Sequence, residues 1–199
     1  MNKPTSFVEH PKERMPNLVR VAFVHLAIAI NITLGSITHA LKLPIYLDAV
    51  GTITTTLLLG WRAGVFAGVG SFLLAGLITN PVLPWFSGTQ AAIAIYTFLA
   101  NKCGGFKSYP RALISGIGLG VVAGTISAPV IAYLFGGITG SGASLIVGFL
   151  LSSGHKLLTS VFLSGIASEP VDKAIQCLLA VWLVRGLPPK LLKSLDRRK

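Results

Sequence analysis

The sequence has little charge and very few acids. Only six of its 199 residues are Asp or Glu, and all charged residues together make up 12% of the chain, whereas a soluble domain carries about 25%. Hydrophobic residues make up 52%, and the mean hydropathy is +0.74. This composition excludes an ordinary soluble domain and predicts an all-α integral membrane protein.

Cysteine is equally scarce, and the motifs of several enzyme classes are missing. Cys103 and Cys177 have no metal-ligand spacing, so we expect both to be unpaired. The Gly-rich stretch 136–142, "GGITGSG", lacks the Lys-Ser/Thr that completes a phosphate-binding loop, so by itself the chain cannot hydrolyse ATP. No carboxylate dyad, metal motif or cofactor motif stands out. We therefore expect a protein without a cofactor that is not an enzyme.

Long apolar runs are abundant. A helix needs about 20 residues to cross roughly 30 Å of hydrocarbon. We predict six transmembrane helices, at 17–41, 45–61, 62–79, 84–101, 111–136 and 170–186. They form a membrane domain over 17–188, which follows an N-terminal tail, 1–16, and precedes a basic tail, 189–199.

The net charge of +11 arises from basic residues at the ends of the chain and in short turns, not from a stripe interleaved with aromatics, so nucleic acid is not the expected partner. The positive-inside rule places both termini in the cytoplasm. An even number of crossings then requires the apolar segment 143–167 to be an outer-side or re-entrant element. We expect it to be broken at 152–156, "SSGHK".

Asp48 is the first acid next to a predicted helix. Asp48, Thr52 and Thr56 are four residues apart and share one helix face. The favoured interpretation is that Asp48 caps the second helix, where the helix dipole stabilises negative charge. Contact with a substrate, or pairing with Lys42 or His39, remains open.

A second polar cluster, "SEPVDKAIQ", covers 168–176. Pro170 fits the first turn of a helix, with Ser168 or Glu169 as its cap, and Glu169 and Lys173 are spaced as an i,i+4 ion pair. Capping does not explain the deeper polar residues Asp172, Lys173 and Gln176. These either face a ligand or pair with one another.

Other polar or aromatic residues are expected on the outer side. Gln90, Trp85 and His155 are further candidates for substrate contact, although Trp85 also suits an interfacial aromatic belt and His155 a packing role. The group Ser152, Ser153 and His155 does not establish the geometry of nucleophilic catalysis. We expect the substrate between the segment around His155 and the start of the last helix.

Three stretches together resemble the substrate-binding S-components of energy-coupling factor (ECF) transporters. They are 41–77, which contains "LPIYLDAVGT", 134–142, "LFGGITGSG", and 168–188, which contains "SEPVDKAIQ". The resemblance implies a multi-pass protein of a prokaryotic cell membrane that binds a vitamin or vitamin precursor from outside. It also implies partners, namely a transmembrane coupling subunit and two ATPase subunits.

Many S-components dock through an Ala-x-x-x-Ala motif on the first helix, which this chain lacks. Small residues of another spacing, Ala22, Ala29 and Thr33, give the expected face for a partner helix. The departure leaves open a solitary vitamin transporter of the cobalamin type. A membrane sensor or an intramembrane enzyme is a further alternative.

Overall fold

The computed structural model describes residues 17–188, and every regular element in this range is a helix. In chain order these are α1 (Asn17–Ala40), α2 (Val50–Leu59), α3 (Trp61–Ile78), the 3-10 helix η1 (Leu83–Phe86), α4 (Ser87–Lys102), α5 (Tyr109–Phe135), α6 (Ala143–Ser152) and α7 (Leu157–Gly186). The predicted all-α class is confirmed. The predicted tails, 1–16 and 189–199, lie outside the described residues.

Three helices, α1, α3 and α5, are long and apolar enough to cross a membrane. With its 24 residues, α1 is about 36 Å long at 1.5 Å per residue. The ten residues of α2, like those of α6, extend over only about 15 Å, which is half of the hydrocarbon core. The predicted number of six crossings is therefore not confirmed and stays a prediction.

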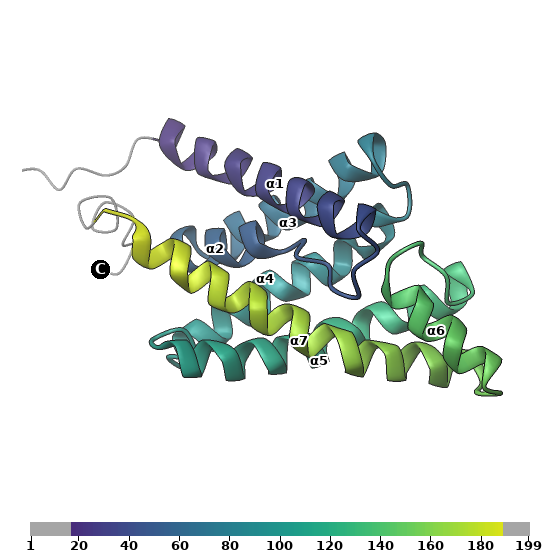
Figure 1. Cartoon of the computed structure of the whole chain (residues 1–199). Helices are drawn as coiled ribbons and strands as arrows, with labels where there is room; N and C mark the ends of the chain where they lie inside the picture. Colours follow the sequence, from purple (N-terminus) through teal and green to yellow (C-terminus); the bar gives the residue numbers. More distant parts are fainter. Residues whose placement is uncertain (1–16, 189–199) are drawn as a thin grey trace, which may run out of the picture.

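The helices run alternately back and forth along one axis, as Figure 1 shows. The closest pair is α5 and α7, which pack against each other along their lengths. The short α2 is central, because it contacts α1, α3, α4 and α7, whereas α1 packs on α2 and α3 alone among the described helices. One face of α1 is therefore left uncovered, and α6 packs on α7 near one end of the molecule.

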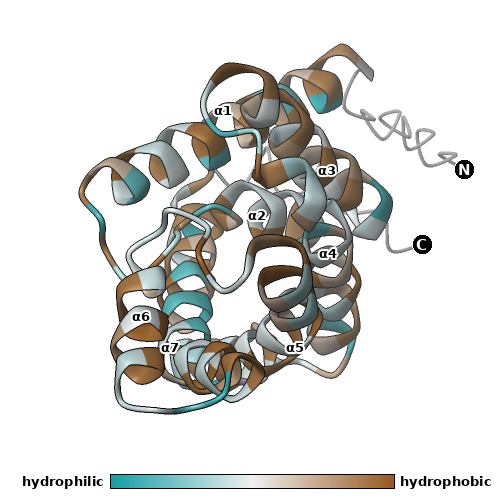
Figure 2. Cartoon of the chain, turned by 90° about the vertical axis from the view of Figure 1, so that its right-hand side faces the viewer, coloured by the Kyte–Doolittle hydropathy of each residue, from teal (hydrophilic) through white to brown (hydrophobic). Residues whose placement is uncertain are grey.

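Apolar side chains prevail outside, and polar ones are common inside. Leu77 is 85% exposed and Phe66 74%, whereas Asn31, Gln90 and Asp172 are buried. Figure 2 shows this hydrophobic character over most helices, with hydrophilic positions on α7 among the exceptions. In water such an exterior would be an aggregation liability, so the distribution is typical of a protein in a lipid bilayer.

Glycine brings α5 and α7 into backbone contact. A Cβ atom on Gly116 would lie 2.5 Å from Ala174 Cα, and one on Gly120 would lie 2.4 Å from Pro170 Cα. Small residues four apart permit this approach between membrane helices, where packing rather than the hydrophobic effect drives association. The glycines therefore hold the polar segment 169–176 of α7 against α5.

One predicted span and one predicted element between spans differ from the structure. Helix α2 begins at Val50 and not at 45, because side chains of α7 hold the backbone N–H groups before it (below). The segment 143–167 was predicted to lie outside the last span, but only its first part does: α6 ends at Ser152, and residues 157–167 belong to α7, which begins at Leu157. The predicted break at 152–156 is confirmed, and Gly154 turns the chain there with φ +87°.

Pro170 was expected in the first turn of the last helix, and this is wrong. It lies inside α7, so Ser168 and Glu169 do not cap a helix. Proline removes one helical hydrogen bond, but neighbouring helices can compensate in membrane proteins. Here α5 packs along α7, and Gly120 leaves room beside Pro170. One helix therefore continues from the end of the predicted segment 143–167 through the predicted span 170–186. Both cysteines are free, as predicted.

We predict that Gly120→Ala destabilises the protein by about 1–3 kcal/mol, because a methyl group there overlaps the α7 backbone. Its matched control is Gly165→Ala, since a Cβ there meets nothing within 4 Å and the change improves helix propensity by up to about 1 kcal/mol. Thermal unfolding in detergent measures both. Equal unfolding midpoints for the two variants would contradict the close packing of α5 on α7.

Candidate binding site

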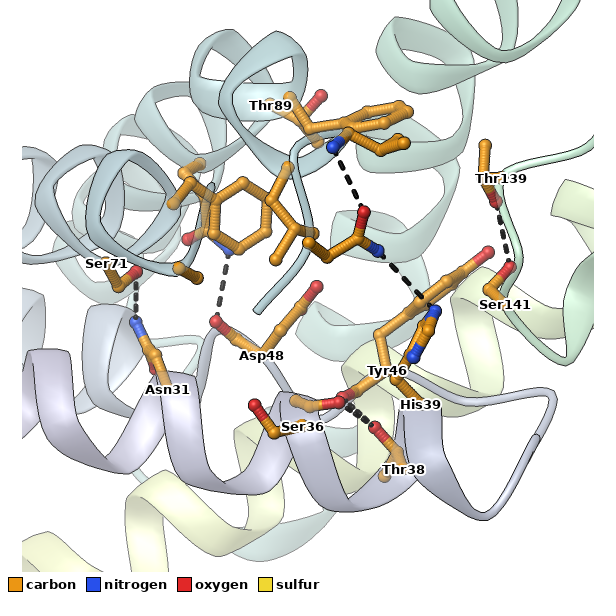
Figure 3. A pocket seen from close by; sticks show the side chains of 18 of the residues that line it. Asn31, Ser36, Thr38, His39, Tyr46, Asp48, Ser71, Thr89, Thr139 and Ser141 are labelled. Carbon is orange, nitrogen blue, oxygen red and sulfur yellow. Dashed lines mark hydrogen bonds between the residues drawn. The ribbon is translucent and has the colours of Figure 1, made fainter. Parts of the chain in front are cut away.

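A cavity of about 180 Å³ lies among α1, α3, α4 and α7 and the segment 43–49 that leads into α2. Figure 3 shows Asn31 and Ser71 on one flank, Thr139 and Ser141 on the other, and Asp48 and Tyr46 between them. An apolar cavity of about 150 Å³ holds one benzene molecule. The volume here therefore suits a molecule built on one substituted ring.

The segment 43–49 is fixed by Asp172 of α7. Oδ1 of Asp172 accepts hydrogen bonds from the backbone N–H groups of Tyr46 and Leu47, at 2.9 and 3.0 Å. Its Oδ2 accepts from Lys173 Nζ at 2.6 Å and from Gln176 Nε2 at 2.7 Å. Asp172 has no exposed surface, so a single buried carboxylate holds the irregular segment and two polar neighbours in place.

Leu47 shows how tightly this segment is held. Its φ is +52°, a left-handed conformation that costs a residue with a side chain about 1–2 kcal/mol. Such conformations persist where the surroundings over-determine them, often beside functional sites. The bond from Leu47 N–H to Asp172 supplies that constraint.

The start of α2 is capped by other helices, which corrects the expectation that Asp48 caps it. Ala49 occupies the N-cap position, and its side chain makes no capping hydrogen bond. Gln176 Oε1 instead accepts from Ala49 N–H at 2.9 Å, and Asn31 Oδ1 accepts from Gly51 N–H at 2.7 Å. These two amides thus bind two N–H groups at the start of the helix, and the Asp48 carboxylate faces the cavity instead.

A chain of buried polar side chains joins α1, α2, α3 and α4 along one wall of the cavity. Asn31 Nδ2 donates to Thr52 Oγ1 at 2.9 Å and to Ser71 Oγ at 3.2 Å. Thr52 Oγ1 donates to Gln90 Oε1 at 2.8 Å, and Gln90 Nε2 donates to the Asp48 carbonyl at 3.2 Å. A connected network of this kind holds its members rigidly, so this wall of the cavity is preformed.

Three carboxylates surround one ammonium group. Lys173 Nζ lies 2.6 Å from Asp172 Oδ2 and 3.5 Å from both Asp48 Oδ1 and Glu169 Oε2. The predicted i,i+4 pair of Glu169 and Lys173 is thus confirmed. The partner of Asp48 is Lys173, not Lys42 or His39, and Lys173 also lies 5.5 Å from the centre of the Tyr46 ring.

The remaining walls are mostly apolar, and two turns meet at the outer edge. Phe72, Phe86 and Ile93 supply flat or branched surfaces to the cavity. At the edge, Lys42 Nζ donates to the Gly140 carbonyl at 2.8 Å, and this bond joins the turn after α1 to the turn after α5. An apolar cavity with a few fixed polar groups is typical of small-molecule sites.

The structure brings together some of the predicted site residues. Asp48, Gln90 and Lys173 line the cavity. Asp172 and Gln176 lie directly behind it and bind the backbone of 46–49, so they position the wall and do not form it.

Trp85 and His155 do not line this cavity, which corrects their predicted place. Trp85 is 62% exposed on η1, as in an interfacial belt. His155 is exposed in the turn between α6 and α7, where its Nδ1 lies 3.2 Å from the Leu150 carbonyl. The expected pocket around His155 is displaced because α7 is one helix, whose charged middle, not its start, meets the segment 43–49.

Nor do the serines near His155 form a catalytic pair. The hydroxyls of Ser152 and Ser153 both donate to the Phe149 carbonyl, at 2.8 and 2.9 Å. They are therefore engaged with the end of their own helix, and no described hydrogen bond joins either of them to His155.

Sequence reasoning did not assign Tyr46, Ser71 and Glu169 to the site, although all three line the cavity. The position of Glu169 directly before Pro170 predicts a helix cap and not a cavity wall. The sequence did contain a signal. Glu169 lies only three residues before Asp172, in a chain that has only six acidic residues in all. Comparisons with protein-family models, curated proteins and solved structures found no match.

We predict that Asp172→Asn lowers the free energy of unfolding by about 3–5 kcal/mol, because an amide NH₂ would face the donors on Lys173 and Gln176. Glu169→Gln is the matched control, since it removes an equal charge from a carboxylate whose Oε2 accepts no hydrogen bond. Unfolding in detergent, followed by helical signal, compares the two. Equal losses would show that charge alone, and not the hydrogen bonds of Asp172, stabilises the segment 43–49.

Proposed function

We infer that this chain is a six-crossing protein of a prokaryotic cell membrane that binds a vitamin or vitamin precursor from outside. In this proposal it delivers its substrate as the S-component of an ECF-type transporter. The observation that carries the proposal is a ring-sized cavity with a few fixed polar and charged groups inside a helical protein with an apolar exterior. Buried polar groups in a membrane protein mark substrate or ion sites.

The distribution of basic residues supports an outward-facing cavity. The C-terminal end of α7 and the turn between α4 and α5 lie together, because Arg185 Nη2 donates to the Lys107 carbonyl at 2.9 Å. Arg62, Lys102 and Arg111 begin or end helices at this same end (Figure 1). The cavity is bordered by the turns at the opposite end, so the positive-inside rule orients it outward and both termini inward.

A short α2 is compatible with six crossings. The segment 43–49 enters the protein from the outer end as irregular backbone, and α2 continues toward the basic end. Irregular backbone at membrane depth is tolerated where protein surrounds it. Here Asp172, Gln176 and Thr38 accept or donate the hydrogen bonds that lipid cannot.

The exposed face of α1 supports docking onto a coupling subunit. Ala22, Ala29 and Thr33 are all exposed, and among the described helices α1 packs only on α2 and α3. Small exposed side chains let a partner helix approach closely. The coupling subunit and its two ATPases would supply the energy for transport.

The test of the proposed function is whether a small molecule copurifies in the cavity. Ser36 lines the cavity from α1, and no described hydrogen bond involves its side chain, so Ser36→Trp fills the cavity. Ile37→Trp is the matched control, because the neighbouring side chain is 49% exposed. We expect native mass spectrometry of gently purified protein to show a bound molecule that Ser36→Trp loses and Ile37→Trp retains. Retention by both variants would place the ligand elsewhere and argue against this function.

We further predict that Ala29→Trp abolishes uptake by cells that express the complete transporter, while binding of the copurified molecule in detergent stays at the parental level. A bulky side chain blocks close helix approach but lies outside the cavity. Ile114→Trp is the matched control, because it places a tryptophan at a lipid-facing position of α5 that is 69% exposed. It should leave uptake at the parental level. Unimpaired uptake with Ala29→Trp would rule out this face as the docking surface and favour a solitary transporter.

A further inference from the structure

The charges around the cavity do not balance. Lys173 carries one positive charge, whereas Asp48, Glu169 and Asp172 carry three negative charges when ionised. Asp172 lies closest to the ammonium, at 2.6 Å, and all its oxygens accept hydrogen bonds. It therefore forms the ion pair with Lys173, and two carboxylates remain in excess.

The two excess carboxylates are the ones that face the cavity. Asp48 and Glu169 both line it, whereas Asp172 does not. Their contacts with Lys173, at 3.5 Å each, are long for a charge-assisted hydrogen bond. Neither interaction equals the bond that Asp172 makes, so both carboxylates are available to a ligand.

Glu169 supplies an observation that points independently to a ligand. Its side chain is only 9% exposed, yet Oε2 has no hydrogen-bond partner among the described residues. Glu169 also borders a small second cavity of about 20 Å³ beside Tyr46 and Ser164. Apart from its long 3.5 Å contact with Lys173 Nζ, this buried oxygen makes no hydrogen bond, which is costly. Its position on a cavity wall therefore points to a donor that comes from outside the protein.

We propose that the cavity takes a small single-ring molecule with a cationic nitrogen, such as a primary amine or a protonated nitrogen heterocycle, held between Asp48 and Glu169. This inference rests on the proposed function and names its substrate class. The nitrogen would donate to Oε2 of Glu169, which accepts no hydrogen bond within the protein, and would offset one excess charge. The ring would lie against Phe72, Phe86 and Ile93.

Other charge classes fit less well. An anionic ligand would add a further negative charge beside Asp48 and Glu169 in a poorly solvated site, where like charges repel strongly. A bare metal ion competes with Lys173 Nζ, which already lies within 3.5 Å of all three carboxylates. Within residues 17–188, no group of three metal-binding side chains is arranged to hold an ion.

The other titratable side chains on the cavity wall, the neutral phenol of Tyr46 and the imidazole of His39, do not reverse this balance. His39 lies at the edge, with its Nε2 3.5 Å from Asn80 Nδ2. Lys42 does not line the cavity, and its Nζ is bound to the Gly140 carbonyl. Apart from Lys173, the basic groups thus lie at the rim and the negative groups inside, an arrangement that orients a cationic end inward.

Three probes of matched shape test the proposal: benzylammonium, neutral benzyl alcohol and anionic benzoate. Each is titrated by calorimetry into the full-length protein in lipid nanodiscs, with calcium chloride as a separate titrant. We expect benzylammonium to bind at least about tenfold more tightly than benzyl alcohol, which corresponds to about 1.4 kcal/mol, and benzoate to bind most weakly. Glu169→Gln should reduce the preference for benzylammonium over benzyl alcohol about tenfold.

Lys102→Gln is the matched control, because it also changes the net charge by one but lies at the far end of α4 from the cavity. It should leave the preference unchanged. The proposal is overturned if benzyl alcohol or benzoate binds as tightly as benzylammonium, or if benzylammonium fails to bind at millimolar concentration. It is also overturned if calcium alone binds, or if Glu169→Gln keeps the parental preference for benzylammonium. A copurified molecule that Ser36→Trp releases, together with a preference for benzoate, would preserve the proposed function and remove only this inference.

Discussion

The buried carboxylate of Asp172 is the constraint on which the site depends. It joins the backbone of Tyr46 and Leu47 to Lys173 and Gln176, so one side chain links the irregular segment 43–49 to α7. A bilayer offers no water to these groups, and each needs a partner inside the protein. The segment therefore stops short of helical geometry, α2 begins late, and the space left beside it becomes the cavity.

Close packing of α5 on α7 determines where this carboxylate lies. Gly116 and Gly120 let the two backbones touch along the stretch that bears Glu169 and Lys173. That contact keeps α7 continuous through Pro170 and brings its charged middle beside the start of α2. The fold thus uses small residues outside the cavity to position charged residues on its wall, and the apolar exterior is left to face lipid.

Several parts of the site were readable in the sequence, and others were not. Asp48, Gln90 and Lys173 were recognised because ionisable and amide side chains are rare in this chain. Asp172 and Gln176 were recognised too, but whether they faced a ligand or paired with one another stayed open. Trp85 and His155 were misplaced, since residue type alone does not tell which turn lies beside a cavity.

The sequence by itself determined the all-α class, the limits of α1, α3 and α5 to within two residues, and the break at 152–156, because hydropathy and glycine act locally along the chain. Only the tertiary structure decided that α2 is short, that Pro170 lies inside a helix and that Glu169 faces the cavity. Each of these depends on partners more than 45 residues away in the chain, such as Asp172 for Leu47 and Gly120 for Pro170. Contacts at that separation leave no periodic pattern in the sequence, since they arise only when distant helices pack together.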